Sequence, residues 1–166
     1  MARKPSVRSR AGRAAPRART EKPCDRILDV TVVLLENGHP STAIGPIEVF
    51  HSAGFLWNWL HGETQQPRFR VRTASIDGRS VNSVCSVGLT PQCAIGDIKQ
   101  TDIIILSTSG WDVQARIAQT TPLLSWLRKW HSRGAYIAGI CTSVAFLAES
   151  GLLDGRRATT HWGVAE

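Results

Sequence analysis

The chain has 166 residues, of which 42% are hydrophobic and 20% are charged, values that are typical of one globular domain and exclude a fibrous protein. The formal net charge is +7, but residues 1–22 carry eight basic side chains and one acidic side chain, whereas the rest of the chain carries twelve of each sign. The excess charge therefore does not indicate a nucleic-acid-binding surface on the body of the chain.

Residues 1–25 are predicted to be a disordered basic tail. Residues 1–22 contain no aromatic side chain, and Val7 is their only large aliphatic one, so little apolar burial is available to offset the ordering entropy. Neither a secretory signal nor a run of about 18 apolar residues is present. We therefore expect a cytoplasmic protein without a membrane span, whose cysteines are reduced and hold no metal or cofactor.

From residue 26 onward, the first elements alternate between strand and helix. Residues 27–35 (ILDVTVVLL) form a nearly continuous run of β-branched and aliphatic residues, as in a strand that is buried on both faces. Apolar residues at helical spacing over residues 44–57 then predict a helix with Pro46 in its first turn. Next, Asp77 and Gly78 predict the turn of a hairpin whose strands are residues 69–74 and 81–87.

The second half repeats this alternation. Residues 102–106 (DIIIL) predict another buried strand, followed by a loop of small residues at 107–110. Thr121 and Pro122 are an expected N-cap and first-turn proline of a helix that Gly134 ends. A strand over residues 135–140 then leads through Cys141 into an apolar helix over residues 143–150. The alternation predicts an α/β fold, a doubly wound and mostly parallel sheet with helices on both faces.

Cys141 has the sequence context of a nucleophile elbow, in which a buried strand turns sharply into a helix between small residues. Such a turn exposes the side chain above the sheet, near N–H groups that favour a thiolate. The backbone N–H groups of Thr142 and of the loop around Gly110 would together stabilise an oxyanion. The alternative interpretation is an unreactive, buried core cysteine.

Three separated motifs resemble those of the ThiJ/PfpI family, within the class I glutamine amidotransferase-like superfamily. They are residues 139–162 (GICTSVAFLAESGLLDGRRATTHW), 43–50 (AIGPIEVF) and 102–110. Among its members, the chain is most similar to the sensor half of AraC-type transcriptional regulators. The resemblance implies a flavodoxin-like domain over residues 26–166, with a strand at 159–162 and the start of a helix after it. Because the chain ends at Glu166, the domain is expected to lack its final strands and helix and any helix-turn-helix domain.

By this resemblance, Cys141 stands at the family's nucleophile position and His161 at that of the nearby histidine. The enzymes of the family have a carboxylate just before their first helix, where this chain has Thr42, which cannot hold a proton as a carboxylate does. Glu36, at the end of the first strand, is a candidate replacement acid. Glu48 lies within the helix and is expected to be a solvated or helix-capping charge. Without a partner acid, a purely structural role for His161 remains an alternative.

We therefore favour a ligand-sensing domain of an AraC-type transcriptional regulator over an enzyme. A small-molecule pocket is expected at the carboxyl ends of the strands, lined by Thr42, Gly110, Trp111, Cys141 and Thr142. DNA would be contacted only through the absent helix-turn-helix domain, and a homodimer is left open. The alternative is a cysteine-dependent hydrolase or hydratase of small molecules, in which Cys141 attacks and His161 transfers protons.

Overall fold

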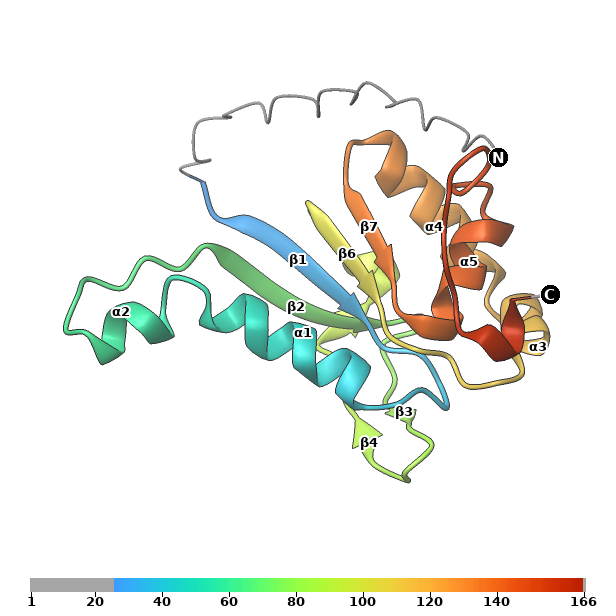
Figure 1. Ribbon diagram of the computed structural model, residues 1–166, viewed down its shortest axis with the longest axis horizontal. Helices are drawn as coiled ribbons and strands as arrows, with labels where there is room; N and C mark the ends of the chain where they lie inside the picture. The colour runs from blue at the N-terminus through green and yellow to red at the C-terminus, as the bar shows by residue number, and fades with distance from the viewer. Residues whose placement is uncertain (1–25, 166) are drawn as a thin grey trace, which may run out of the picture.

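The computed structural model describes residues 26–165 (Figure 1), so the predicted tail at residues 1–25 lies outside the described part of the chain. The strands are β1 (Leu28–Val33), β2 (Phe69–Ser75), β3 (Val81–Asn82), β4 (Gly88–Leu89), β5 (Cys93–Ala94), β6 (Ile103–Leu106) and β7 (Tyr136–Gly139). The α-helices are α1 (Ser41–Ser52), α2 (Leu56–Leu60), α3 (Val113–Gln119), α4 (Thr121–Ser132) and α5 (Val144–Glu149). Three short 3-10 helices span Ile95–Asp97, Cys141–Ser143 and Trp162–Val164.

Five parallel strands form the central sheet, in the order β5-β2-β1-β6-β7. Alternate residues of β1 enter two separate cores: Val33 packs with the side chains of α4 and α5, whereas Val32 packs with those of α1. The helices thus cover both faces, with α1 on one side and α4 and α5 on the other (Figure 1). The predicted doubly wound fold is confirmed.

The strand order also locates the crevice at the carboxyl edge. From β1 the chain first adds β2 on one side and later adds β6 on the other. The loops that follow β1 and β6 therefore diverge, which is the arrangement that opens a crevice in doubly wound folds. Both predicted strands, 27–35 and 102–106, contain the observed β1 and β6.

The predicted hairpin around Asp77 and Gly78 is wrong. Gly78 does adopt a turn conformation, with φ of +82°, but β2 is already paired with β1 and β5, so it does not pair with the strand that follows it. Instead, β3 pairs with β4, and Val81 lies opposite Leu89. The antiparallel hairpin thus begins at Val81, where the second strand of the predicted hairpin was expected to begin.

The predicted helix over residues 44–57 is two helices. α1 begins at Ser41, so Pro46 is its sixth residue and not part of its first turn. The helix ends before Gly54, whose φ is +74° and where an added Cβ would lie 2.0 Å from the carbonyl oxygen of Gln66. That close backbone approach breaks the apolar periodicity into α1 and α2.

Smaller differences concern the second half of the chain. The N-cap of α4 is Thr120, one residue before the predicted one, while Gly134 follows the helix with φ of +91° as expected. α3 was not predicted. Residues 159–162 form no strand, and a 3-10 helix over Trp162–Val164 stands where the next helix was expected.

Asp102 connects the starts of β1 and β6. Its carboxylate accepts hydrogen bonds from Arg26 at 2.6 and 2.8 Å and from the backbone N–H of Asp29 at 2.8 Å. The bonds from Arg26, helped by that of Asp29 and opposed by partial burial, hold the pKa of the Asp102 carboxyl below its usual range. The charged form is therefore favoured by folding.

Replacing Asp102 with asparagine is expected to destabilise the protein by about 1 kcal/mol at neutral pH, since exposed ion pairs contribute little beyond that. A lowered pKa stabilises the folded state above the unfolded-chain pKa of about 3.9 and ceases to do so as the pH falls through the folded value. Thermal unfolding should accordingly show a difference between wild type and variant that narrows below about pH 4. Asp154→Asn, at an exposed site, is the control and should change little.

Candidate functional site

Cys141 lies at a strained turn between β7 and α5. Its φ is +59°, a conformation that side chains other than glycine rarely adopt. The fully buried hydroxyl of Ser143 fixes this turn: it accepts from the N–H of Ile140 at 2.8 Å and lies 3.0 Å from the Leu106 carbonyl oxygen, to which it can donate. The strand-to-helix elbow predicted from the sequence is therefore present, with one 3-10 turn inserted before α5.

A small cavity of about 70 Å³ opens at this elbow. It is lined by His39, Thr108, Gly110, Trp111, Cys141, Thr142 and His161. Four of the five predicted ligand-binding residues and the predicted histidine thus line one space. Sequence reasoning missed His39 and Thr108, although both lie in loops that follow strands of the sheet, where pockets of doubly wound folds form.

The two predicted oxyanion donors belong to this cavity. The backbone N–H groups of Gly110 and Thr142 have no hydrogen-bond acceptor within residues 26–165. Gly110 has φ of +75°, and an added Cβ would lie 2.9 Å from the carbonyl oxygen of Asn37. The Ser109 N–H donates to the Thr142 hydroxyl at 3.2 Å, which ties the loop to the elbow. The arrangement can offer two N–H donors to a carbonyl or anionic oxygen.

Thr42 lies behind the cavity and does not line it. Its hydroxyl donates to the His39 carbonyl oxygen at 2.6 Å and accepts from the Thr108 N–H at 3.1 Å. Thr42 therefore supports the loop that forms the cavity wall. The structure places this side chain where it holds backbone groups together, whereas the sequence predicted a direct contact with the ligand.

Glu36 does not replace the missing acid. Its carboxylate accepts from the N–H of Asn82 at 3.1 Å and faces a separate cavity that Arg116 also lines. Glu48 is exposed on α1, as expected. None of the described residues that line the Cys141 cavity is an aspartate or a glutamate.

His161 is held in one orientation. Its Nδ1 accepts a hydrogen bond from the Gly163 N–H at 3.0 Å, so the neutral ring carries its proton on Nε2. The ring meets the Trp111 indole edge-on, with centroids 4.6 Å apart, and the neighbouring Thr160 hydroxyl donates to the Cys141 carbonyl oxygen at 2.9 Å. Within residues 26–165, the Cys141 thiol has no hydrogen bond to a histidine.

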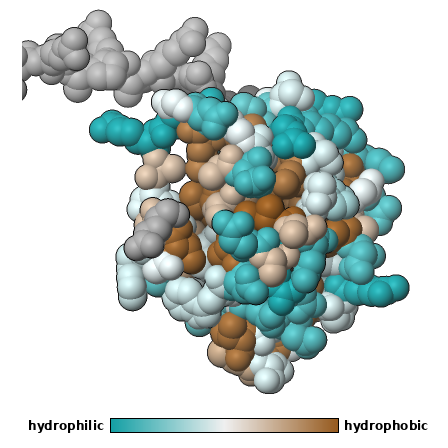
Figure 2. Space-filling model, turned by 90° about the vertical axis from the view of Figure 1, so that its right-hand side faces the viewer, coloured by the Kyte–Doolittle hydropathy of each residue, from teal (hydrophilic) through white to brown (hydrophobic). Residues whose placement is uncertain are grey.

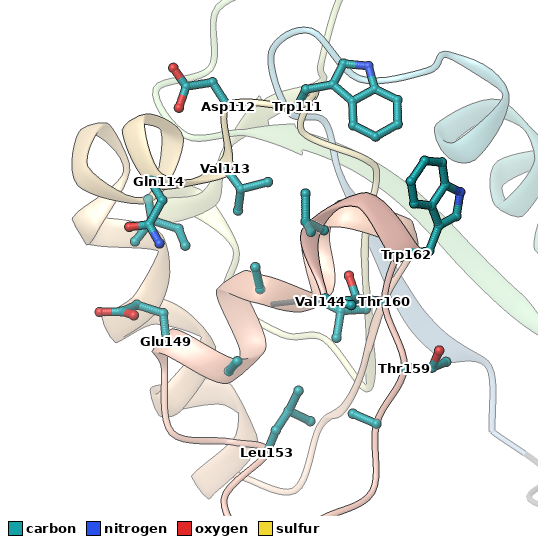
Figure 3. Close-up of a pocket in the computed structure, with 16 residues that line it drawn as sticks. Trp111, Asp112, Val113, Gln114, Val144, Glu149, Leu153, Thr159, Thr160 and Trp162 are labelled. Atoms are coloured by element: carbon teal, nitrogen blue, oxygen red, sulfur yellow. The ribbon is translucent and has the colours of Figure 1, made fainter.

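A wider groove of about 990 Å³ adjoins the small cavity. It lies between α3, α5 and the segment that contains Trp162, and Trp111 lines both spaces. Figure 2 shows hydrophobic residues gathered in the middle of this face of the molecule. In Figure 3, Trp111 and Trp162 lie at one end of the groove, and Glu149 lies on the opposite side. A molecule in the small cavity could extend past Trp111 into the groove.

The three described cysteines differ in their surroundings and are all unpaired: Cys85 is exposed, whereas Cys93 and Cys141 are partly buried. Burial raises the pKa of the Cys93 thiol, with a further increase from Asp97 and an opposing effect of Arg72. Residues 26–165 contain no cluster of three or more side chains suited to hold a metal ion. No helix in this range combines the length and the apolar character that crossing a membrane requires.

Comparison with known proteins supplies the remaining evidence. Residues 29–166 match the DJ-1/PfpI family. The HTH-type transcriptional regulator CdhR of Pseudomonas aeruginosa is 35% identical over 124 residues, which cover 73% of this chain and 32% of that protein. Isonitrile hydratase of Pseudomonas putida is 29% identical over 82 residues, which cover 49% of this chain and 35% of the hydratase. The chain thus spans about a third of the length of these curated relatives.

A solved structure agrees with this match at the level of the fold. The crystal structure of an AraC family transcriptional regulator from Pseudomonas putida has a TM-score of 0.60 and 21% identity to this chain. The similarity covers 78% of this chain and 64% of that structure.

Proposed function

The chain belongs to the DJ-1/PfpI family, and on that premise we propose that residues 26–166 form the ligand-sensing domain of an AraC-type transcriptional regulator. The observation that carries this proposal is the Cys141 cavity, which keeps the elbow and two free N–H donors but has no carboxylate among its described lining residues. Such a cavity can bind a small polar molecule, whereas catalysis at the Cys141 thiol would lack a carboxylate to accept or donate a proton. The resemblance to CdhR supports the regulatory role.

In this proposal one ligand occupies both the small Cys141 cavity and the adjoining groove. Its polar end would accept hydrogen bonds from the N–H groups of Gly110 and Thr142, and Trp111 would pack against its body where the cavity meets the groove. Cys141 would be a contact or a redox-responsive thiol. DNA would be bound in the cytoplasm by a separate helix-turn-helix domain of the regulator, since residues 23–166 carry equal numbers of basic and acidic side chains.

The test is a thermal-unfolding screen of small amino acids, amines and carboxylates. A ligand at about 100 times its Kd should stabilise the fold by about 2.7 kcal/mol, which corresponds to a rise in Tm of roughly 5–10 °C for a chain of this size. The same compound should slow the alkylation of Cys141 by iodoacetamide and leave that of the exposed Cys85 unchanged. Cys93 should react slowly throughout because its pKa is raised.

Variants assign the effect to this cavity. Trp111→Ala should weaken the response, whereas Tyr136→Ala, an exposed aromatic at the opposite end of β7 from the elbow, should not. A stabilising compound that leaves Cys141 labelling unchanged would bind elsewhere and would contradict the proposal. So would a compound whose effect survives in Trp111→Ala but is lost in Tyr136→Ala.

The second candidate is a cysteine-dependent hydrolase or hydratase, which the elbow at Cys141 and the similarity to isonitrile hydratase favour. It requires a base for the thiol, and the described structure offers His39 and His161 at the cavity without a hydrogen bond from the thiol to either.

A further inference from the structure

A second cavity, of about 390 Å³, lies at the carboxyl edge of the sheet, apart from the Cys141 cavity. It is formed where β1 and β2 end, above the β3–β4 hairpin (Figure 1), and it is bounded by residues of α3 and α5. Its volume lies within the usual range for small-molecule sites, roughly 300–1,000 Å³. None of its described lining residues also lines the Cys141 cavity or the adjoining groove. The ligand-sensing site therefore does not account for this second cavity.

One loop separates the two cavities. Thr108 and Gly110 line the Cys141 cavity, whereas Ser109, between them, lines the second cavity. Ser109 is fully buried, and its N–H donates to the Thr142 hydroxyl at 3.2 Å, which fixes the loop in place. Successive residues of this loop thus serve different spaces, and a molecule can occupy the second cavity without entering the first.

The inner wall of the second cavity is largely apolar. Leu34 and Leu35 follow β1 and are buried, and Phe146 of α5 is fully buried. Ser75, also buried on this wall, already donates its hydroxyl to the carbonyl oxygen of Arg79 at 2.8 Å. Apolar side chains of this kind favour a ligand that has a small aliphatic part to bury against them.

The charged groups at the second cavity are balanced, with two carboxylates and two guanidinium groups. Asp77 and Arg79 lie on an exposed turn and form an ion pair with each other at 3.6 Å. Glu36 and Arg116 are only partly exposed, and neither forms an ion pair with any described residue. The second cavity therefore has one carboxylate and one guanidinium group that the described chain leaves without a charged partner.

Both of these groups keep atoms available for a ligand. One carboxylate oxygen of Glu36 accepts from the Asn82 N–H at 3.1 Å, and one terminal nitrogen of Arg116 donates to the Gln119 side chain at 3.3 Å. Within residues 26–165, the other oxygen of Glu36 and the other side-chain nitrogens of Arg116 make no hydrogen bond. These two bonds fix the side chains without using up their hydrogen-bonding capacity.

Opposite charges that line one cavity without pairing suit a ligand that carries both charges. A guanidinium group binds a carboxylate through two parallel hydrogen bonds, and a carboxylate accepts hydrogen bonds from a primary ammonium group. A ligand with only a negative charge would bury the Glu36 carboxylate without a partner, and one with only a positive charge would do the same to Arg116. Since burying an unpaired charge is costly, a zwitterion fits this cavity best.

We propose that the second cavity is a separate binding site and that it takes a small aliphatic amino acid. The carboxylate of the amino acid binds Arg116, and its ammonium group donates to Glu36. Its side chain packs against Leu35 and Phe146. The site goes beyond the proposed ligand-sensing function, because it uses none of the residues that line the Cys141 cavity.

The experiment is an NMR titration of the full chain with L-valine as the probe. Wild type is expected to bind L-valine with a Kd of roughly 1 mM or tighter, an affinity that a ligand of this size can reach. Isobutylamine and isovalerate have similar aliphatic parts, but each lacks one of the two charged groups. Both should therefore bind at least about 10-fold more weakly, the effect of losing a hydrogen bond to a charged group.

Variants of the two charged residues locate the site. Arg116→Gln and Glu36→Gln should each weaken the binding of L-valine by at least about 10-fold. The glutamine at position 36 can still accept from the Asn82 N–H, so that variant should fold, as circular dichroism will show. The matched controls are Arg128→Gln and Glu48→Gln, which change exposed residues outside the second cavity and should leave binding unchanged.

A further variant separates this site from the Cys141 cavity. Trp111→Ala alters both that cavity and the adjoining groove and should bind L-valine as tightly as wild type. A loss of binding in this variant would place the amino acid beside Cys141 and overturn the proposal. Failure of wild type to bind L-valine would overturn it too, as would isovalerate or isobutylamine binding equally well. Folded Arg116→Gln and Glu36→Gln variants that bind as tightly as wild type would also contradict it.

Discussion

Replacing Gly38 with alanine should destabilise the folded chain by about 3 kcal/mol, the upper part of the usual range for overpacked sites. Gly38 lies in the loop after β1, and an added Cβ would lie 2.0 Å from the Thr108 carbonyl oxygen and 3.0 Å from its hydroxyl. Thr108 is buried, and it belongs to the loop that forms one wall of the Cys141 cavity. Because the added Cβ would clash with the backbone of Thr108, rotating a side chain cannot relieve the clash. The loop itself must move.

The same variant should alter the candidate site. The Thr108 hydroxyl accepts from the His39 N–H at 2.6 Å, and the Thr108 N–H donates to Thr42. Both hydrogen bonds depend on the position of Thr108, which the clash disturbs. We therefore expect Gly38→Ala to lower Tm by roughly 6–12 °C and to reduce any thermal stabilisation by a ligand of the cavity.

Gly96→Ala is the control, because a Cβ at that position meets nothing within 4 Å and its backbone has no positive φ. Its Tm should match that of wild type. An unchanged Tm in Gly38→Ala would mean that the loops after β1 and β6 are not in contact as the structure has them, and the described cavity would then be wrong.

The sequence patterns that proved sufficient were those set by burial on both faces. Residues 30–35 and 103–106 carry no charged side chain and are buried apart from the half-buried Ile103, as expected of central strands in a parallel sheet. The elbow at Cys141 was predictable from the small residues on either side of it, Gly139 and Ser143, which leave room for a sharp turn. A Cβ at Gly139 would lie 3.1 Å from the backbone of Val144.

The errors arose where a tertiary contact decided between local alternatives. Asp77 and Gly78 form a turn in either arrangement, but the pairing of β2 with β1 and β5 removes it from a hairpin. At Gly54, contact with residue 66 divides one apolar pattern into α1 and α2. Neither contact leaves a signal in the local sequence.

The candidate site likewise combines residues that a sequence motif identifies with residues that only tertiary contacts bring to the cavity. Cys141, Thr142 and Gly110 are marked by the turns they occupy, and a motif identifies each of them. His39 has no motif, and it reaches the cavity only because the loop after β1 is bonded to Thr108. The direction in which Thr42 and Glu36 point is likewise set by backbone partners, Thr108 and Asn82, that lie far away in sequence.

The wild-type chain should show negligible turnover of glyoxals, isonitriles and activated esters. Attack by a thiol needs one group that accepts its proton and another that donates to the product, and such general acid–base assistance contributes about 10²–10⁴ in rate. At the Cys141 cavity no aspartate or glutamate is present among the described lining residues, and the Nδ1 of His161 is already bonded to Gly163. The thiol is thus left without a positioned carboxylate.

A carboxylate introduced at position 42 should restore part of that assistance. Thr42→Glu places a carboxylate at the second residue of α1, beside the Thr108 backbone that walls the cavity, and we expect it to raise residual activity by up to about 10²-fold. Thr42→Gln has nearly the same shape but takes up no proton, so it should leave the rate unchanged, and adding Cys141→Ala to Thr42→Glu should abolish the gain. A cooperative thermal transition must first establish that each variant is folded. If the folded wild-type chain instead turns over one of these substrates rapidly, and both Thr42 variants only slow it, the protein is a hydrolase or hydratase whose proton transfers use His39 or His161, and the sensing function is wrong.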